Sequence, residues 1–277
     1  MRSDIIVKAV PCLQDNYAWL LHESISGQTA VIDPGQAEPV LAALTSHGWT
    51  LSHIINTHHH GDHVGGNLAL LANTNAQLYA SAYDLQQQRI PGGDSGRSHP
   101  LQDGQQVFLG QKFLTTIAVP GHTLGHIALY HAPQDSEPGL LFSGDTLFSL
   151  GCGRLFEGTA PQLWQSLRRL RALPGNTLMY AGHEYTLKNG SFVRYLGLNS
   201  PELEEYLTKC QQKRSKNHPT LPSSMEIECF FNPFLRADSP EVATAVMHHL
   251  SVEPGLANQQ PTPQDVFGWL RRLRDSF

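Results

Sequence analysis

A dense run of histidines is the part of the sequence best suited to chemistry. The chain has 15 histidines, and four of them lie between residues 58 and 63, around Asp62. In an extended segment alternate side chains share a face, so His58 and His60 point one way and His59 the other. The glycine that follows allows a turn, which can bring Asp62 and His63 to a second position beside the first. Imidazole and carboxylate groups bind divalent metals, so the run predicts a metal site rather than a surface polyhistidine stretch.

Three further candidate ligands each follow a segment with the pattern of a strand. His122 comes shortly after residues 115–119, Asp145 after 140–144 and His183 after 178–182. Layered α/β proteins assemble their sites in loops at strand ends, and a glycine beside each of these residues lets the backbone turn tightly. One such histidine or aspartate alone is more often structural. All three together with the histidine run indicate a single shared metal site.

The elements that must position these residues are short strands with helices between them. Helical patterns cover residues 39–47, which end at Gly48, and a segment from Pro161 to Pro174-Gly175 with Leu163, Leu167 and Leu170 on one stripe. Mixed strands and helices through about residue 183 predict a layered α/β domain. The apolar segments that predict strands are 5–10, 17–22, 29–33, 53–56, 77–80, 113–119, 127–131, 140–143 and 177–181.

The pattern changes after Tyr185, from where helices separated by proline-containing turns dominate. The expected helices include 201–216, 240–250 and 263–275. We therefore expect two domains, residues 1–185 and a helical part at 186–277.

Composition narrows the choice of partners and of compartment. The chain has 277 residues, 40% of them hydrophobic, and a net charge of −5, so no extended basic surface is available for nucleic acid. The four cysteines form no CxxC pair, and the N-terminus does not resemble a secretion signal. No apolar stretch approaches the roughly 18 residues that a membrane span requires. We expect a cytoplasmic monomer that binds neither nucleic acid nor a membrane.

The order and spacing of the candidate ligands resemble the metal-binding signature of the metallo-β-lactamase superfamily. Within it the chain resembles the hydroxyacylglutathione hydrolases, or glyoxalase II, and the supporting segments are 151–158 (GCGRLFEG), 182–186 (GHEYT) and 271–277 (RRLRDSF). The resemblance implies an α/β (α+β) fold, an αββα sandwich with a dinuclear metal site at its edge and a C-terminal helical domain. It places one metal at His58, His60 and His122 and the other at Asp62, His63 and His183, with Asp145 bridging.

The same resemblance implies a thioester hydrolase. A hydroxide that bridges the metals, held through Asp62 and Asp145, would attack the carbonyl of S-D-lactoylglutathione and other S-2-hydroxyacylglutathiones. The products would be glutathione and D-lactate or another 2-hydroxy acid, in the second step of methylglyoxal detoxification. Two divalent cations favour ionisation of water at neutral pH, and a thiolate leaves without full protonation. We expect zinc, although iron and manganese suit the same ligands.

Cations near the C-terminus are candidates for the substrate site. Arg271 and Arg274 lie three residues apart and share a helix face, and the resemblance implies that they bind the glycine carboxylate of glutathione. Many relatives have tyrosine where this chain has Phe156, which cannot donate a hydroxyl hydrogen bond to the peptide. The other positions that match glutathione contacts are Arg154, Phe156, Tyr185 and Asn189.

Other readings of the same residues remain open from the sequence. A metal-dependent phosphodiesterase or ribonuclease of the same superfamily would need a basic track, against which the net charge argues. A β-lactam hydrolase would generally lack the bridging Asp145, and a redox diiron protein usually has glutamate in place of His60. Cys152 could in principle be a nucleophile, but no histidine is evident to activate it. His59 and His126 are expected to be structural.

Overall fold

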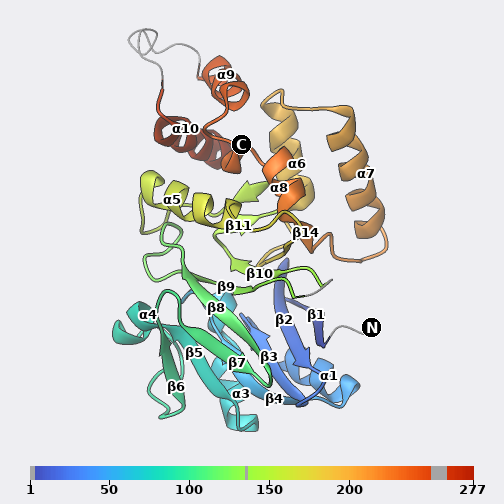
Figure 1. Ribbon diagram of the computed structural model, residues 1–277, viewed down its shortest axis with the longest axis vertical. Coiled ribbons are helices and arrows are strands. Elements are labelled where there is room, and N and C mark those ends of the chain that lie inside the picture. The colour runs from blue at the N-terminus through green and yellow to red at the C-terminus, as the bar shows by residue number, and fades with distance from the viewer. Residues whose placement is uncertain (1–3, 135–136, 251–260) are drawn as a thin grey trace.

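Two six-stranded sheets pack face to face in the computed structural model, which describes residues 4–134, 137–250 and 261–277 (Figure 1). The first sheet has the strand order β1-β2-β3-β4-β5-β6, and β3 to β6 run parallel. Its strands are β1 (Ile5–Cys12), β2 (Asn16–Glu23), β3 (Gln28–Ile32), β4 (Thr50–Ile55), β5 (Gln77–Ser81) and β6 (Ser98–Leu101).

The second sheet has the order β14-β13-β10-β9-β8-β7, and within it only β10 and β13 pair in parallel among the described residues. A two-stranded hairpin of β11 (Leu147–Phe148) and β12 (Gly151–Cys152) follows β10. The strands of the sheet are β7 (Gln106–Leu109), β8 (Lys112–Ala118), β9 (Ile127–His131), β10 (Leu140–Gly144), β13 (Leu178–Ala181) and β14 (Ser223–Ser224).

Helices cover the outer faces of both sheets. Strand β2 is therefore buried on both faces. Trp19 and Leu21 lie in the cluster between the sheets, and Ala18 and Leu20 lie in the cluster under the outer helices. A strand covered on both faces is apolar throughout rather than alternating. The helices of this part are α1 (Ala37–His47), α2 (Gly61–Val64), α3 (Asn67–Asn73), α4 (Ala82–Gln86) and α5 (Ala160–Arg171).

The C-terminal part is mainly helical and packs at one end of the sandwich (Figure 1). It also supplies β14, which pairs with β13 of the second sheet. A two-residue strand is too short to leave a periodic pattern, so the sequence does not reveal it. The helices are α6 (Thr186–Tyr195), α7 (Pro201–Arg214), α8 (Met225–Phe231), a 3-10 helix (Pro233–Leu235), α9 (Pro240–His249) and α10 (Pro263–Ser276).

The expected αββα sandwich with C-terminal helices is therefore confirmed, and the differences lie at element ends. Helix α5 begins at a capping box of Thr159 and Gln162 and buries Leu163, Leu167 and Leu170 as predicted. It ends at Arg171, before the expected Pro174. Strands β6 and β7 and the short helices α2, α4 and α8 carry too few residues for their periodicity to be recognised.

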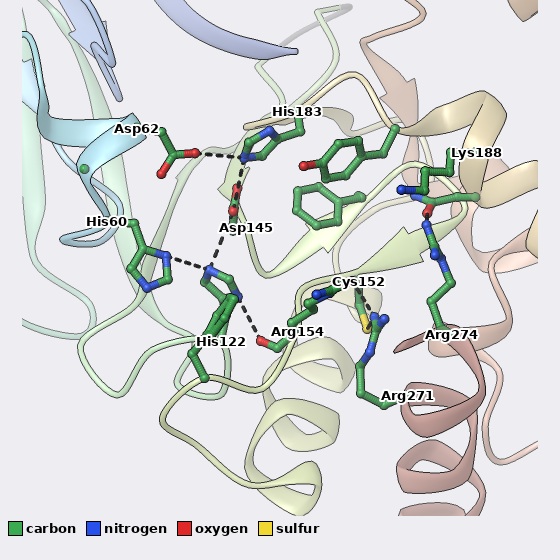
Figure 2. Close-up of a pocket in the computed structure, with 15 residues that line it drawn as sticks. His60, Asp62, His122, Asp145, Cys152, Arg154, His183, Lys188, Arg271 and Arg274 are labelled. Atoms are coloured by element: carbon green, nitrogen blue, oxygen red, sulfur yellow. Dashed lines mark hydrogen bonds and ion pairs between the residues drawn. The ribbon is translucent and has the colours of Figure 1, made fainter. Parts of the chain in front are cut away.

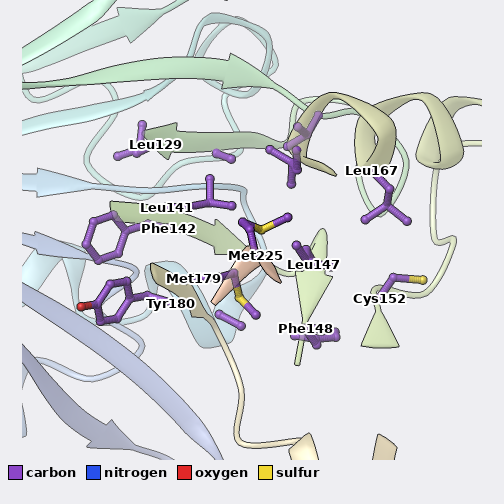
Figure 3. Packing of buried hydrophobic residues seen from close by; sticks show 14 of the residues in the cluster. Leu129, Leu141, Phe142, Leu147, Phe148, Cys152, Leu167, Met179, Tyr180 and Met225 are labelled. Carbon is purple, nitrogen blue, oxygen red and sulfur yellow. The ribbon is translucent and has the colours of Figure 1, made fainter. Parts of the chain in front are cut away.

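The main core runs without a break from the sandwich to the hairpin beside the site (Figure 3). Phe142 and Met179 fill the space between the sheets, and Met225 of α8 joins the C-terminal part to the same cluster. Leu147 and Cys152 of the hairpin belong to it as well. The site loops therefore rest on a packed core rather than on solvent. No helix in the described ranges combines the length and the apolar character that a membrane span requires.

Candidate active site

The candidate metal ligands come from segments that follow four strands and meet at one edge of the sandwich, with Asp62 and His63 in the short helix α2 (Figure 2). The histidine run follows β4, His122 follows β8, Asp145 directly follows β10, and His183 follows β13. Among the described residues, three groups have ligand atoms that all lie within 4.8 Å of one another, and one of them, Asp33 with His58 and His63, overlaps the other two. Two of these groups are those that the resemblance implied: His58 with His60 and His122, and Asp62 with His63 and His183.

The first group consists of three imidazoles whose ring nitrogens lie close together. His60 Nδ1 lies 3.1 Å from His58 Nε2 and 3.1 Å from His122 Nε2. Burial lowers the pKa of His58 well below its usual value, and burial together with His122 lowers the pKa of His60 to about 4. Neutral imidazoles are the form that binds metal, so this group is ready to take a cation.

The second group is joined to the first by Asp145. Asp145 Oδ1 lies 3.4 Å from His63 Nε2, and its Oδ2 lies 3.3 Å from His183 Nε2 and 3.6 Å from His122 Nε2. Asp62 Oδ2 lies 3.5 Å from His63 Nε2 and 3.4 Å from His183 Nε2. Burial disfavours the charge on Asp145, yet His63 and His183 hold its pKa well below the usual range. A charged carboxylate between two groups of ligands is the arrangement that a bridging ligand requires.

Carboxylate and carbonyl groups behind the ligands orient their rings. His122 Nδ1 donates to the backbone carbonyl of Arg154 at 2.8 Å, and His183 Nδ1 donates to Asp15 Oδ1 at 2.8 Å. Each bond uses the N–H at Nδ1, so that Nε2 faces the centre of the site, where it would give its lone pair to a bound metal.

Asp33 supports two of the other histidines, His63 directly and His58 through Thr57. Its Oδ2 lies 3.1 Å from His63 Nδ1 and also accepts the hydroxyl of Thr57 at 2.7 Å. Since that hydroxyl is donated to Asp33, its oxygen is left to accept from His58 Nδ1 at 3.0 Å. Neither Asp15 nor Asp33 was identified from sequence. Asp33 ends a predicted strand, the same signal that pointed to Asp145, but nothing in the sequence shows what it contacts.

The residues present fit two metal ions. His63 Nε2 and Asp145 Oδ1 are buried and have no hydrogen-bond partner in the described parts of the chain, although they lie 3.4 Å apart. Buried polar atoms without partners are costly, and a cation between them would satisfy both. The donor set of five imidazoles and two carboxylates suits Zn, Fe or Mn.

Asp15→Ala should weaken metal binding without unfolding the protein. The substitution removes the acceptor of His183 Nδ1, and loss of such an outer partner typically costs about 10- to 100-fold in metal affinity. Titration against a chromophoric chelator measures the change. Asp94→Ala, which removes an exposed carboxylate outside the site, should leave the affinity unchanged. Equal affinities for both variants would show that Asp15 does not orient His183.

A pocket of about 510 Å³ extends from these ligands to a wall of cations (Figure 2). Phe156 is 63% exposed at its mouth, and its ring centre lies 5.3 Å from that of His60 and 5.2 Å from that of His122. Lys188, which was not identified from sequence, also lines it. All six residues that the resemblance assigned to the substrate line this pocket: Arg154, Phe156, Tyr185, Asn189, Arg271 and Arg274.

The two arginines of α10 are buried and held by different partners. Arg271 donates from Nη1 to the carbonyl of Cys152 at 2.9 Å and from Nη2 to Asp275 at 2.9 Å, while its buried Nε meets no hydrogen-bond partner within residues 4–134, 137–250 and 261–277. Arg274 donates from Nη2 to Asn189 Oδ1 at 3.2 Å. Asn189 therefore positions Arg274 in addition to facing the pocket. Fixed guanidinium groups with free donors suit bidentate recognition of a carboxylate.

The hairpin that supports this wall is fixed from the C-terminal part. Glu228 Oε2 accepts the backbone N–H of Leu150 at 2.8 Å, and Leu150 has a left-handed φ of 59°. Asn232 Nδ2 donates to the carbonyls of Phe148 at 3.1 Å and Gly151 at 3.0 Å. A buried polar network of this kind specifies one position of the turn. Sequence reasoning missed both residues, because each lies in the C-terminal part, far from the hairpin in the chain.

Three other residues behave as structural or inert groups. Burial raises the pKa of Cys152 to about 11, so its thiol is protonated and unsuited to nucleophilic attack. His59 turns away from the metal ligands, with its Nδ1 3.2 Å from Asp84 Oδ1. His126 Nε2 accepts the backbone N–H of Asp145 at 3.1 Å and thereby helps to hold that loop.

Comparisons with known proteins agree with this arrangement. The family model of the metallo-beta-lactamase superfamily matches residues 14–183, and that of the hydroxyacylglutathione hydrolase C-terminus matches residues 184–277. The hydroxyacylglutathione hydrolase of Ectopseudomonas mendocina is 45% identical over 99% of this chain and 100% of its own. That of Methylococcus capsulatus is 44% identical over 97% of each chain.

Solved structures share the fold. The crystal structure of ETHE1 from Myxococcus xanthus has a TM-score of 0.62 and 24% identity, and the match covers 98% of this chain and 99% of that one. A structure solved in a di-iron-bound form has a TM-score of 0.51 and 29% identity over 64% of this chain and 91% of its own. On both family models and both relatives, the chain belongs to the hydroxyacylglutathione hydrolases of the metallo-β-lactamase superfamily.

Proposed function

We propose that the chain hydrolyses S-2-hydroxyacylglutathiones, with S-D-lactoylglutathione as the reference substrate, to glutathione and the 2-hydroxy acid. One observation carries the proposal: a single pocket joins the cluster of metal-ligand side chains, five of which line it, to a wall of four cations. The first can activate water and a thioester carbonyl, and the second fits the carboxylates of glutathione. The names of the relatives support the same reaction.

Two metal ions would be held by the residues that the structure brings together. We assign His58, His60 and His122 to one ion and Asp62, His63 and His183 to the other, with Asp145 shared. When bound, two divalent cations lower the pKa of water and polarise a carbonyl oxygen. Zinc is the proposed metal, and iron or manganese would use the same ligands.

The other residues of the pocket bind the substrate. Arg271 and Arg274 would hold the glycine carboxylate, and Arg154, Phe156, Tyr185 and Asn189 would surround the peptide. The leaving group is a thiolate whose parent thiol has a pKa of about 8.5, so it needs no general acid. In this division of labour, residues 1–185 form the catalytic domain and residues 186–277 the glutathione-binding domain.

Hydrolysis of S-D-lactoylglutathione by the purified protein tests the proposal. Turnover should be lost on chelation and restored by added metal, and elemental analysis should give two metal ions per chain. Undiminished turnover in the chelated, metal-free protein would contradict the metal assignment. The same sample, analysed by size and by metal content, tests the remaining proposals of a monomer that loads zinc.

A phosphodiesterase or ribonuclease activity is the less favoured function. The cations of the pocket are gathered at one wall near α10 rather than along an extended track, and a polyanion needs the latter. The match to the C-terminal model of the hydroxyacylglutathione hydrolases points away from it as well. We therefore propose that the chain does not bind nucleic acid. We also propose that it acts in the cytoplasm.

A further inference from the structure

Lys188 is a cation of the pocket that has no partner among the residues that the structure describes. It lies on α6 immediately before Asn189, is exposed, and lines the pocket. Figure 2 shows its side chain on the same wall as Arg274, across the pocket from His60 and Asp62. In the described part of the chain, no hydrogen bond or ion pair holds its ammonium group. Its charge is therefore available to a ligand.

The balance of charge on this wall leaves two cations uncompensated. Asp275 lies 3.4 Å from Arg154 and 2.9 Å from Arg271, and thus forms ion pairs with two of the four cations. Lys188 and Arg274 form no ion pair with any described residue. Burial and the neighbouring Arg271 lower the pKa of Arg274, as expected for a cation among cations. Two unpaired cations in one pocket favour a ligand that brings two separate anionic groups.

We propose that Lys188 binds the α-carboxylate of the γ-glutamyl residue, so that separate cations hold the two ends of glutathione. The inference rests on the function proposed above, which leaves this carboxylate without a partner. Arg274 is only 9% exposed and is fixed by Asn189, which suits the inner, glycine end. Lys188 is exposed, as required for the end of the tripeptide that reaches the solvent. Its ammonium on a flexible stem accepts a carboxylate from many directions.

Binding of S-methylglutathione, a thioether that cannot be hydrolysed, tests this contact by calorimetry. Lys188→Ala should raise its Kd about fivefold, the effect of one partly solvated charge pair, and Lys188→Glu should raise it further. S-methylcysteinylglycine lacks the γ-glutamyl residue, so its Kd should be the same for the wild type and both variants. Lys188→Arg should bind S-methylglutathione as the wild type does, because the charge is kept.

The matched control is Lys216→Glu, which makes the same change of charge at an exposed lysine that does not line the pocket. It should leave both dissociation constants unchanged. If the Lys188 variants weaken the binding of S-methylglutathione and of S-methylcysteinylglycine equally, or the binding of neither, the proposed γ-glutamyl contact is wrong. If the wild type hydrolyses glutathione thioesters while the Lys188 variants bind normally, only this inference fails. A wild type that binds no S-methylglutathione would contradict the glutathione site itself, and this inference with it.

Discussion

Asp145→Ala should reduce metal loading and hydrolysis together. Its two carboxylate oxygens lie 3.3–3.6 Å from ligand nitrogens of both groups, so this side chain joins the two groups. Loss of a shared ligand removes several kcal/mol of charge stabilisation, and we expect kcat/KM to fall by about 10³-fold or more. Elemental analysis of the purified variant should find one metal ion or fewer per chain. The two measurements should fall in parallel.

Two further variants separate a loss of metal from a loss of fold. Asp145→Asn keeps the shape of the side chain and one oxygen, so it should retain more metal than Asp145→Ala. Asp238→Asn changes a carboxylate that pairs with Arg171 outside the pocket, and it should keep both metal ions and full turnover. Wild-type turnover by Asp145→Ala with one metal or none would show that the bridging assignment is wrong.

The strand pattern explains why the ligands could be expected from sequence. Asp145 and His183 each end an apolar run with a glycine beside them, and strands β10 and β13 pair in parallel, so the two loops emerge at the same edge. The resemblance supplied their grouping, which strand ends alone do not give. The geometry agrees with that grouping, since the ligand atoms of each set lie within 4.8 Å.

The supporting residues could not be predicted, because their partners are distant in sequence. Asp15 meets His183 across 168 positions, and Glu228 meets Leu150 across 78. No local periodicity encodes such contacts; they depend on how the sheets and C-terminal helices pack. Lys188 was missed for a related reason. It lies on a helix surface, where a lone lysine is ordinarily solvated, and only the assembled pocket distinguishes it.

Arg271→Ala combined with Arg274→Ala should raise the KM for S-D-lactoylglutathione about 100-fold, with kcat reduced less than about threefold. Each guanidinium is expected to contribute a charge-assisted hydrogen bond of roughly 1.5 kcal/mol to the glycine carboxylate. Because that carboxylate is remote from the thioester, its contacts are the same in the ground state and the transition state. Loss of such uniform binding raises KM and leaves kcat in place. Steady-state kinetics over a range of substrate concentrations gives both constants.

Arg272→Ala is the matched control, because Arg272 lies between the two on α10 but is exposed and does not line the pocket. It should leave KM unchanged. Arg271 also holds the carbonyl of Cys152, so the single variants are needed to separate binding from support of the hairpin. Arg274 donates to Asn189 and not to a described hairpin carbonyl, so Arg274→Ala should by itself raise KM about tenfold. A fall in kcat at constant KM for that variant would place Arg274 outside the glutathione site and reassign the cationic wall to another role.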